Sequence, residues 1–222
     1  MVTVVITTCN RPCEMVLRAV KSVQNQTYTN WELFVIDDTP SQYIDERNQI
    51  QQMIVALNDS RISYVQNQEN MGACYSRNVG LSKANGEFIA YLDDDDEWFP
   101  EKISEQLKIF KESEDAVALV YCGSVVVNDN SGKYININTT YLKGDVFYPL
   151  LETNFIGSTS IPLIRTDVLK KIGGFDEQMP ASQDVDVWLR IAKQYEVDYV
   201  EKPLFYYHKH SGECITASIE KR

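Results

Sequence analysis

The sequence predicts an α/β fold with a mainly parallel sheet that is covered by helices on both faces. Four short apolar stretches of strand length alternate with four segments of helical length over residues 1–111. The stretches at 2–8, 31–36 and 88–92 are apolar almost throughout, which is typical of strands buried on both faces. Strict alternation of strands and helices with right-handed crossovers places such strands side by side in parallel.

The individual elements follow from hydrophobic periodicity and turn residues. Apolar residues of the first helix, from Met15 to Val23, recur on one face. The second half is less regular, and the two strands joined by the polar turn at 128–132 are expected to form a hairpin. The expected strands are 2–8, 31–36, 61–65, 88–92, 116–127, 133–138, 158–164, 197–200 and 204–207, and the expected helices are 12–24, 43–57, 74–83, 100–111, 146–151, 166–172 and 184–194.

Length and composition limit the classes of protein. The 222 residues suit one domain or two closely fused subdomains, expected at 1–111 and 112–222, and a hydrophobic content of 44% suffices for a sizeable core. The net charge of −11 argues against non-specific binding to nucleic acid or anionic lipid. The five cysteines are scattered without a C-x-x-C pair, and we find neither a signal peptide nor a run of about 20 apolar residues. These features favour a cytoplasmic protein with reduced thiols.

Four consecutive aspartates, Asp93 to Asp96, follow the apolar stretch at 88–92. Ligands bind at the carboxyl ends of the strands in an open α/β sheet, and the loop at 7–11 and the pair Asp37–Asp38 are expected at the same edge. Adjacent carboxylates repel unless protons, basic side chains or a cation offset their charge. The run is therefore either a solvated turn that caps the helix near Pro100, or a site for Mg²⁺ or Mn²⁺. The buried strand before it favours the metal site.

Several segments occur in a fixed order along the chain, namely Val4-Val5-Ile6-Thr7-Thr8-Cys9-Asn10-Arg11, Ser22-Val23-Gln24-Asn25-Gln26-Thr27-Tyr28, Trp31-Glu32-Leu33-Phe34-Val35-Ile36-Asp37-Asp38, Asn70-Met71-Gly72 with Ser76-Arg77-Asn78-Val79-Gly80-Leu81, the stretch from Gly86 to Asp96, and Ile172-Gly173-Gly174-Phe175-Asp176 with the stretch from Gln183 to Arg190. In this order and at these spacings they resemble the family 2 glycosyltransferases. That family has the nucleotide-diphospho-sugar transferase fold called GT-A. An isolated D-x-D is weak evidence, whereas the ordered set from Val2 to about His210 is a strong signal.

The resemblance assigns the donor nucleotide to the first half of the chain. Thr7 and Cys9 would line the base pocket, and Asp38 matches the acid that hydrogen-bonds the base. Arg77 matches the family's arginine near the nucleotide. Asp38 could instead cap the following helix, and Arg77 could instead pair with an aspartate of the acidic run.

The D-x-D position of the family falls on the first three aspartates of the run. Asp93 and Asp95 would hold the metal on the diphosphate, and Asp94 would face the sugar or the ribose. Asp184 matches the family's proposed general base, although an acid at the start of a helix also favours the macrodipole. His210 lies where family members place a basic residue against the diphosphate.

The activity that the resemblance implies is an inverting, metal-dependent transfer of a sugar from a nucleotide-diphospho-sugar, UDP-linked by family habit. The acceptor would be a hydroxyl of a glycan or a lipid-linked molecule in cell-surface polysaccharide or glycoconjugate synthesis. Mn²⁺ or Mg²⁺ would stabilise the charge on the leaving diphosphate, and a carboxylate would take the acceptor's proton. A lipid-linked acceptor would bring the enzyme to the inner face of the membrane as a peripheral contact, without nucleic acid as a partner.

One position departs from the family pattern, because Gln183 stands where an acid usually precedes the base. This departure is the only support for an alternative hypothesis, that the chain is a non-catalytic module that keeps the nucleotide pocket. A sugar-phosphate nucleotidyltransferase is a further alternative with a related sheet. It would need a glycine-rich loop after the first strand, and the loop Thr7–Pro12 has no glycine.

Overall fold

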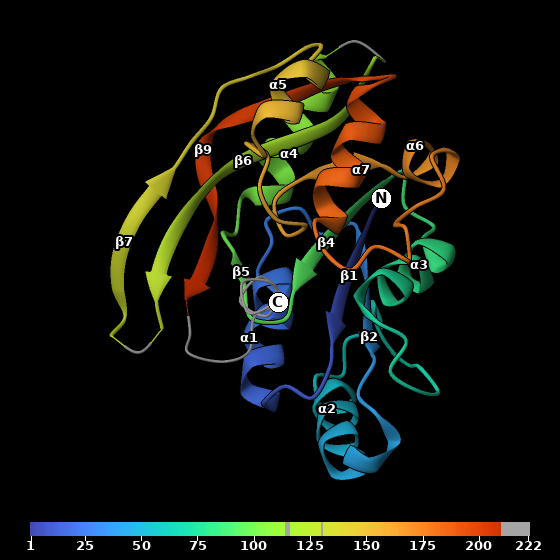
Figure 1. The fold of residues 1–222 in the computed structure, drawn as a ribbon. Coiled ribbons are helices and arrows are strands. Elements are labelled where there is room, and N and C mark those ends of the chain that lie inside the picture. Colours follow the sequence, from blue (N-terminus) through green and yellow to red (C-terminus); the bar gives the residue numbers. More distant parts are fainter. Residues whose placement is uncertain (114–115, 130, 210–222) are drawn as a thin grey trace.

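The computed structural model describes residues 1–113, 116–129 and 131–209, which form one curled sheet with helices packed around it (Figure 1). Within these residues the strand order is β3-β2-β1-β4-β8-β6-β9-β5, and β7 is added to β6. One half of the sheet is parallel and the other is mixed. The predicted α/β class, with a mixed and mainly parallel sheet between helices, is confirmed.

The parallel half consists of β1 (Val2–Thr8), β2 (Trp31–Asp37), β3 (Ile62–Gln66) and β4 (Phe88–Asp93). β1 lies between β2 and β4 and pairs in parallel with both. Its apolar side chains are fully buried, as the lack of alternation predicted, because helices cover both faces.

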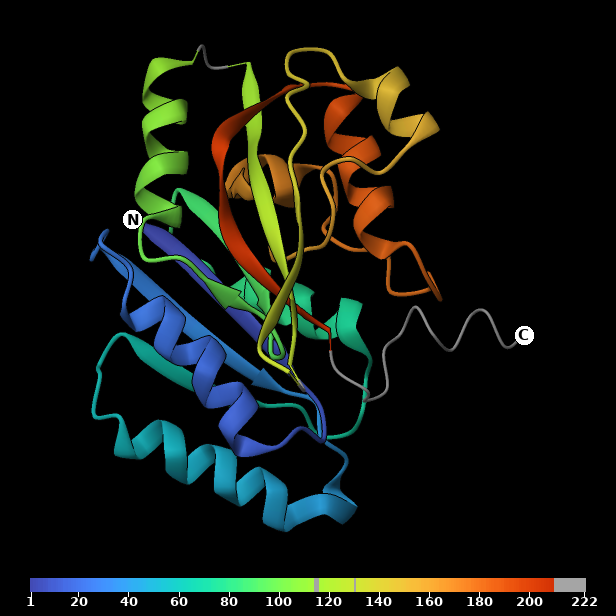
Figure 2. The ribbon, with the colours of Figure 1, turned by 90° about the vertical axis from the view of Figure 1, so that its left-hand side faces the viewer.

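Helices cover both faces of the parallel strands, with α1 (Cys13–Gln24) and α2 (Ile44–Ala56) packed side by side on one face (Figure 2). The short helix η1 (Ser41–Tyr43) precedes α2, and α4 (Lys102–Glu112) packs on β6 and β9. On the other face, α3 (Ala73–Lys83) approaches β1 closely at Gly80, where a Cβ would lie 2.5 Å from the Val5 side chain. This close approach requires glycine and holds the start of α3 at the edge where β1 ends.

The mixed half is built on the long strand β6, which pairs with β7 as the predicted hairpin, with β8 in antiparallel and with β9 in parallel. α5 and α7 pack against each other on this half. The remaining elements are β5 (Glu97–Trp98), β6 (Val117–Asn128), β7 (Lys133–Asn138), α5 (Phe147–Glu152), β8 (Leu163–Arg165), α6 (Thr166–Lys171), α7 (Gln183–Ala192) and β9 (Glu196–Lys209).

Two strand predictions were wrong in extent. The strand expected at 158–164 is only β8, Leu163–Arg165, because the polar residues before it turn away and bond elsewhere. The strands expected at 197–200 and 204–207 are one strand, β9, which continues through a register shift where Pro203 lies opposite Gly123 of β6. The proline interrupts the sequence pattern but not the ladder.

None of the helices in the described ranges is both long enough and apolar enough to cross a membrane.

Candidate functional site

The carboxyl ends of three strands bring the expected site residues to one edge of the sheet. Thr7 of β1 lies opposite Asp93 of β4, and Thr8 lies opposite Asp37 of β2. The N–H of Asp38 donates to the carbonyl of Thr8 at 2.8 Å, which holds the two loops together just beyond the strands. The predicted convergence of these loops is therefore present in the fold.

The acidic turn, which we define as Asp93–Asp96, is partly neutralised by two arginines. Arg77 Nη2 of α3 lies 3.0 Å from Asp93 Oδ1. Arg11, in the loop after β1, lies 3.3 Å from Asp94 Oδ1 through Nε and 3.4 Å from Asp95 Oδ2 through Nη2. The turn is thus not a freely solvated cap, because basic side chains from two other elements contact three of its carboxylates.

Burial sets the electrostatics of the turn. Asp94 is 5% exposed, and this burial, together with the nearby charges of Asp95 and Asp93, raises its pKa to about 7 despite the opposing charge of Arg11. A cation would relieve this unfavourable charge, and carboxylate oxygens are the ligands that Mg²⁺ and Mn²⁺ prefer. In the described part of the chain no three His, Cys, Asp or Glu side chains are grouped to hold a metal by themselves. The donor set therefore fits a metal that takes one or two carboxylates and completes its shell with phosphate and water.

Asp38 holds the loop between β3 and α3. Its carboxylate accepts hydrogen bonds from the N–H of Met71 at 2.9 Å, from the N–H of Gly72 at 2.7 Å and from Asn67 Nδ2 at 2.7 Å. Asp38 is 4% exposed, so these bonds replace water around a buried charge. This role in the loop was not predicted, and the contact of Asp38 with a base stays a prediction.

Cys9 lies beside this loop. Asn70 Nδ2 donates to its Sγ at 3.1 Å, and burial together with the nearby carboxylates of Asp38, Asp37 and Asp94 raises the pKa of the thiol. A thiol that stays protonated is a poor nucleophile. This environment does not favour a nucleophilic role for Cys9, and its place in the base pocket stays a prediction.

Arg77 connects the acidic turn to the beginning of α7. While Nη2 pairs with Asp93, Nη1 donates to Gln183 Oε1 at 3.2 Å. Arg77 is 7% exposed, so both partners contact a buried guanidinium. Sequence reasoning foresaw the pairing with an aspartate but not the bond to Gln183, which is 106 residues away.

Asp184 follows Gln183 in the first turn of α7. Its Oδ1 accepts the N–H of Val185 at 2.9 Å, and its Oδ2 lies 3.3 Å from Asn154 Nδ2. Burial raises the pKa of Asp184, with the first-turn amides and Arg77 opposing the rise. Asp184 thus follows directly on the residue that contacts Arg77, and the charges of both Arg77 and Asp93 act on its carboxylate.

Further polar residues support the acidic turn and were not foreseen. Arg18 Nη2 donates to the carbonyl of Asp95 at 2.7 Å and pairs with Asp129, while His208 Nδ1 lies 2.6 Å from Asp129. These contacts connect α1, β9 and the end of β6, and no local sequence motif predicts them. His210, the histidine expected at the diphosphate, lies outside the described residues.

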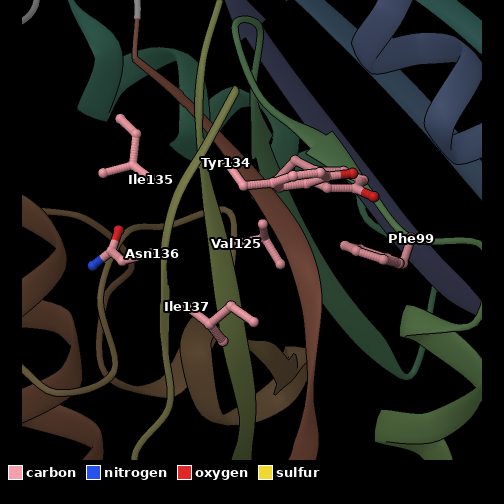
Figure 3. Close-up of a pocket in the computed structure, with 7 residues that line it drawn as sticks. Phe99, Val125, Tyr134, Ile135, Asn136 and Ile137 are labelled. Carbon is pink, nitrogen blue, oxygen red and sulfur yellow. The ribbon is translucent and has the colours of Figure 1, made fainter. Parts of the chain in front are cut away.

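A shallow apolar groove of roughly 370 Å³ lies on the mixed half of the sheet (Figure 3). The rings of Phe99 and Tyr206 stack in it with centroids 4.2 Å apart. None of the expected site residues within the described ranges lines this groove, which is bordered by Phe99, Val125, Tyr134, Ile135, Asn136, Ile137 and Tyr206.

The fold is that of the GT-A glycosyltransferases. TarS of Staphylococcus aureus, residues 1–349 in complex with UDP-GlcNAc, matches with a TM-score of 0.73 at 21% identity over 97% of this chain and 60% of that one. The mannosyltransferase PcManGT of Pyrobaculum calidifontis, in complex with GDP-Man and Mn²⁺, matches with a TM-score of 0.69 at 17% identity, over 93% of this chain and 56% of that one. At these identities the likeness shows the fold.

The chain belongs to glycosyl transferase family 2, whose model matches residues 3–173. WcaA, a provisionally assigned colanic acid biosynthesis glycosyl transferase of Escherichia coli strain K12, is 33% identical over all of this chain and 77% of its own length. WfgD of Escherichia coli, a UDP-Glc:α-D-GlcNAc-diphosphoundecaprenol β-1,3-glucosyltransferase, is 31% identical over 82% of this chain and 66% of its own length. The family resemblance seen in the sequence is confirmed.

Proposed function

We propose that the protein transfers a sugar with inversion from a nucleotide-diphospho-sugar to a hydroxyl acceptor, with a divalent metal held at the acidic turn. The observation that carries this proposal is the position of Arg77 between Asp93 and Gln183, with contacts of 3.0 and 3.2 Å. One buried arginine thereby contacts both the acidic turn and the first turn of α7, which carries Asp184. Transfer requires that the donor diphosphate and the base that takes the acceptor's proton are held close together. Residues 1–111 would bind the donor and residues 112–222 the acceptor.

Asp93 and Asp95 would hold Mn²⁺ or Mg²⁺, which supplies Lewis-acid stabilisation of the leaving diphosphate. Asp94 would contact the ribose or the sugar, and Thr7, Cys9 and Asp38 would bind the base. His210, outside the described residues, keeps its proposed place at the diphosphate.

Asp184 is the proposed general base. Its Oδ1 accepts a helix N–H at 2.9 Å, whereas Oδ2 has the longer contact of 3.3 Å with Asn154, so Oδ2 would take the acceptor's proton as the new bond forms. The raised pKa of this carboxylate makes it a stronger base than a solvated aspartate. A single displacement assisted by one base inverts the anomeric carbon.

The relatives support the finer assignment of substrates. WfgD is named for a UDP-Glc donor and a diphosphoundecaprenol-linked acceptor, and one TarS structure contains UDP-GlcNAc. We therefore propose a UDP-linked donor and a glycan or lipid-linked acceptor, used in the cytoplasm at the inner face of the membrane. The nucleotidyltransferase alternative lacks the glycine-rich loop it needs, and the binding-module alternative rests only on Gln183.

The test is thermal unfolding with UDP, GDP, CDP or ADP, each with and without Mn²⁺. A ligand at about a hundredfold its dissociation constant adds on the order of 2.7 kcal/mol to the free energy of unfolding. We expect UDP with Mn²⁺ to stabilise the protein and Asp95→Asn to remove that effect. Stabilisation by a different diphosphate would correct the donor class, and stabilisation by none of them would contradict the proposal. Donor turnover with an acceptor then separates an enzyme from a binding module.

A further inference from the structure

The segment between α5 and β8 contacts the acidic turn through Ser160. Its Oγ accepts the N–H of Asp93 at 3.0 Å and donates to Asp96 Oδ2 at 2.9 Å, and its carbonyl accepts Trp98 Nε1 at 2.7 Å. Ser160 has no exposed surface, so water does not compete for these bonds. One residue thus contacts the first and last residues of the turn and the strand that follows.

Thr159 adds a contact to the carboxylate itself. Its hydroxyl lies 3.2 Å from both Oδ1 and Oδ2 of Asp93, the same carboxylate that pairs with Arg77. Thr159 is 3% exposed. The side chain of Asp93 is therefore held from two sides, by a guanidinium from α3 and by a hydroxyl from this segment.

The chemistry of the hydroxyl fixes the direction of the Ser160 bonds. An amide N–H can only donate, so the Asp93 N–H occupies a lone pair of Oγ. The one hydroxyl proton is then available for Asp96. Alanine can supply neither bond and leaves two buried polar groups without this partner. Negative charges on neighbouring residues of the turn repel one another, and the contacts of Ser160 at both ends of the turn oppose a change in its shape.

The same segment continues to α7. The carbonyl of Gly157 accepts Trp188 Nε1 at 3.1 Å, and the N–H of Gly157 donates to Asn154 Oδ1 at 3.0 Å. Asn154 in turn lies 3.3 Å from Asp184. The segment therefore contacts both the turn proposed to hold the metal and the proposed base.

We propose that Thr159 and Ser160 are positioning residues, which hold the acidic turn in the geometry that binds the metal. This inference rests on the proposed metal site, but the holding of the turn itself can be measured without metal. Outer-shell partners of metal ligands typically contribute 10- to 100-fold to metal affinity or activity.

The first measurement is amide hydrogen exchange in the metal-free protein. In Ser160→Ala the Asp93 amide should exchange about tenfold faster or more, because its acceptor is gone, while the Ala90 amide of the same strand keeps its rate. Ser22→Ala is the matched control, because Ser22 is a buried serine whose hydroxyl donates to the carbonyl of Ala19 within α1. An unchanged Asp93 exchange rate would overturn the proposed holding of the turn, whether or not the protein binds a metal.

The second measurement is calorimetric titration with Mn²⁺ in the presence of UDP. Ser160→Ala and the isosteric Thr159→Val should each weaken Mn²⁺ binding by about 10- to 100-fold, and Ser22→Ala should not. In turnover, the half-saturating Mn²⁺ concentration should rise while the donor KM at saturating Mn²⁺ stays close to that of the wild type. If Ser160→Ala does not fold, Thr159→Val decides the question. Equal Mn²⁺ affinity in variant and wild type refutes the inference, whereas a wild-type protein that binds no Mn²⁺ refutes the proposed metal site instead.

Discussion

Replacing Asp94 with asparagine should stabilise the metal-free protein far more at pH 8 than at pH 5. Asp94 is buried among other carboxylates, and its pKa rises from 3.8 to about 7 in the folded protein. A raised pKa means that the folded state keeps a proton that the unfolded chain loses. The contribution of Asp94 to the free energy of unfolding is therefore fully present below about pH 4, and it is lost as the pH rises towards 7.

The magnitude follows from this shift. Each pKa unit corresponds to 1.36 kcal/mol, so the raised pKa of Asp94 lowers the free energy of unfolding by about 4 kcal/mol at pH 8, where the folded protein has lost this proton, and by about 2 kcal/mol at pH 5, where it still keeps it. Asparagine has a similar shape and does not ionise. The stability difference between Asp94→Asn and wild type should therefore grow by about 2–3 kcal/mol between pH 5 and pH 8.

The assay is urea denaturation in a chelating buffer at both pH values, followed by tryptophan fluorescence. Titrating groups remote from Asp94 are common to both proteins, so they cancel in the difference. Asp45→Asn, at an exposed position on α2, is the control and should show no such change with pH. A stability difference that is the same at pH 5 and pH 8 would show that Asp94 does not carry this charge and would falsify the electrostatic account of the turn.

Two further substitutions separate binding, chemistry and stability. Asp184→Asn should keep Mn²⁺-dependent UDP binding in calorimetry and lower turnover by about 10²- to 10⁴-fold, and a normal rate would remove its role as base. In the wild type, turnover should fall as the pH drops through the raised pKa of Asp184, because the protonated carboxyl accepts no proton. Asp38→Ala should lower the free energy of unfolding by about 3 kcal/mol, since the N–H groups of Met71 and Gly72 lose a charged acceptor; a loss no larger than in Asp45→Ala contradicts its role in the loop.

The parallel half of the fold could be read from the sequence because its signals are local. Continuous apolar stretches specify buried strands, and the strand ends specify where Thr7, Asp38 and Asp93 meet. The resemblance then supplied roles for these positions that spacing alone does not give. The acidic turn and its edge position follow from one short segment of sequence.

The support of the site could not be read in the same way, because its contacts are remote in sequence. Ser160 lies 67 residues from Asp93, and Arg77 lies 106 residues from Gln183. The hydroxyl residues before β8 look like part of a strand, and only the folded chain shows that they turn towards the acidic turn. The two strands expected at 197–200 and 204–207 were wrong for the opposite reason. Pro203 interrupts the local strand pattern, but β9 pairs with β6 on both sides of this residue.

The charge distribution around the site bears on how an acidic protein can bind an anionic donor. The chain has a net charge of −11, so the attraction for a diphosphate must be local. Arg11 and Arg77 supply it, but both are engaged with carboxylates of the acidic turn. A divalent cation on Asp93 and Asp95 would take over that neutralisation, which frees the arginines for phosphate oxygens. The proposed metal and donor sites are therefore expected to be positively coupled, so the affinity for UDP should rise with Mn²⁺ and the affinity for Mn²⁺ should rise by the same factor with UDP.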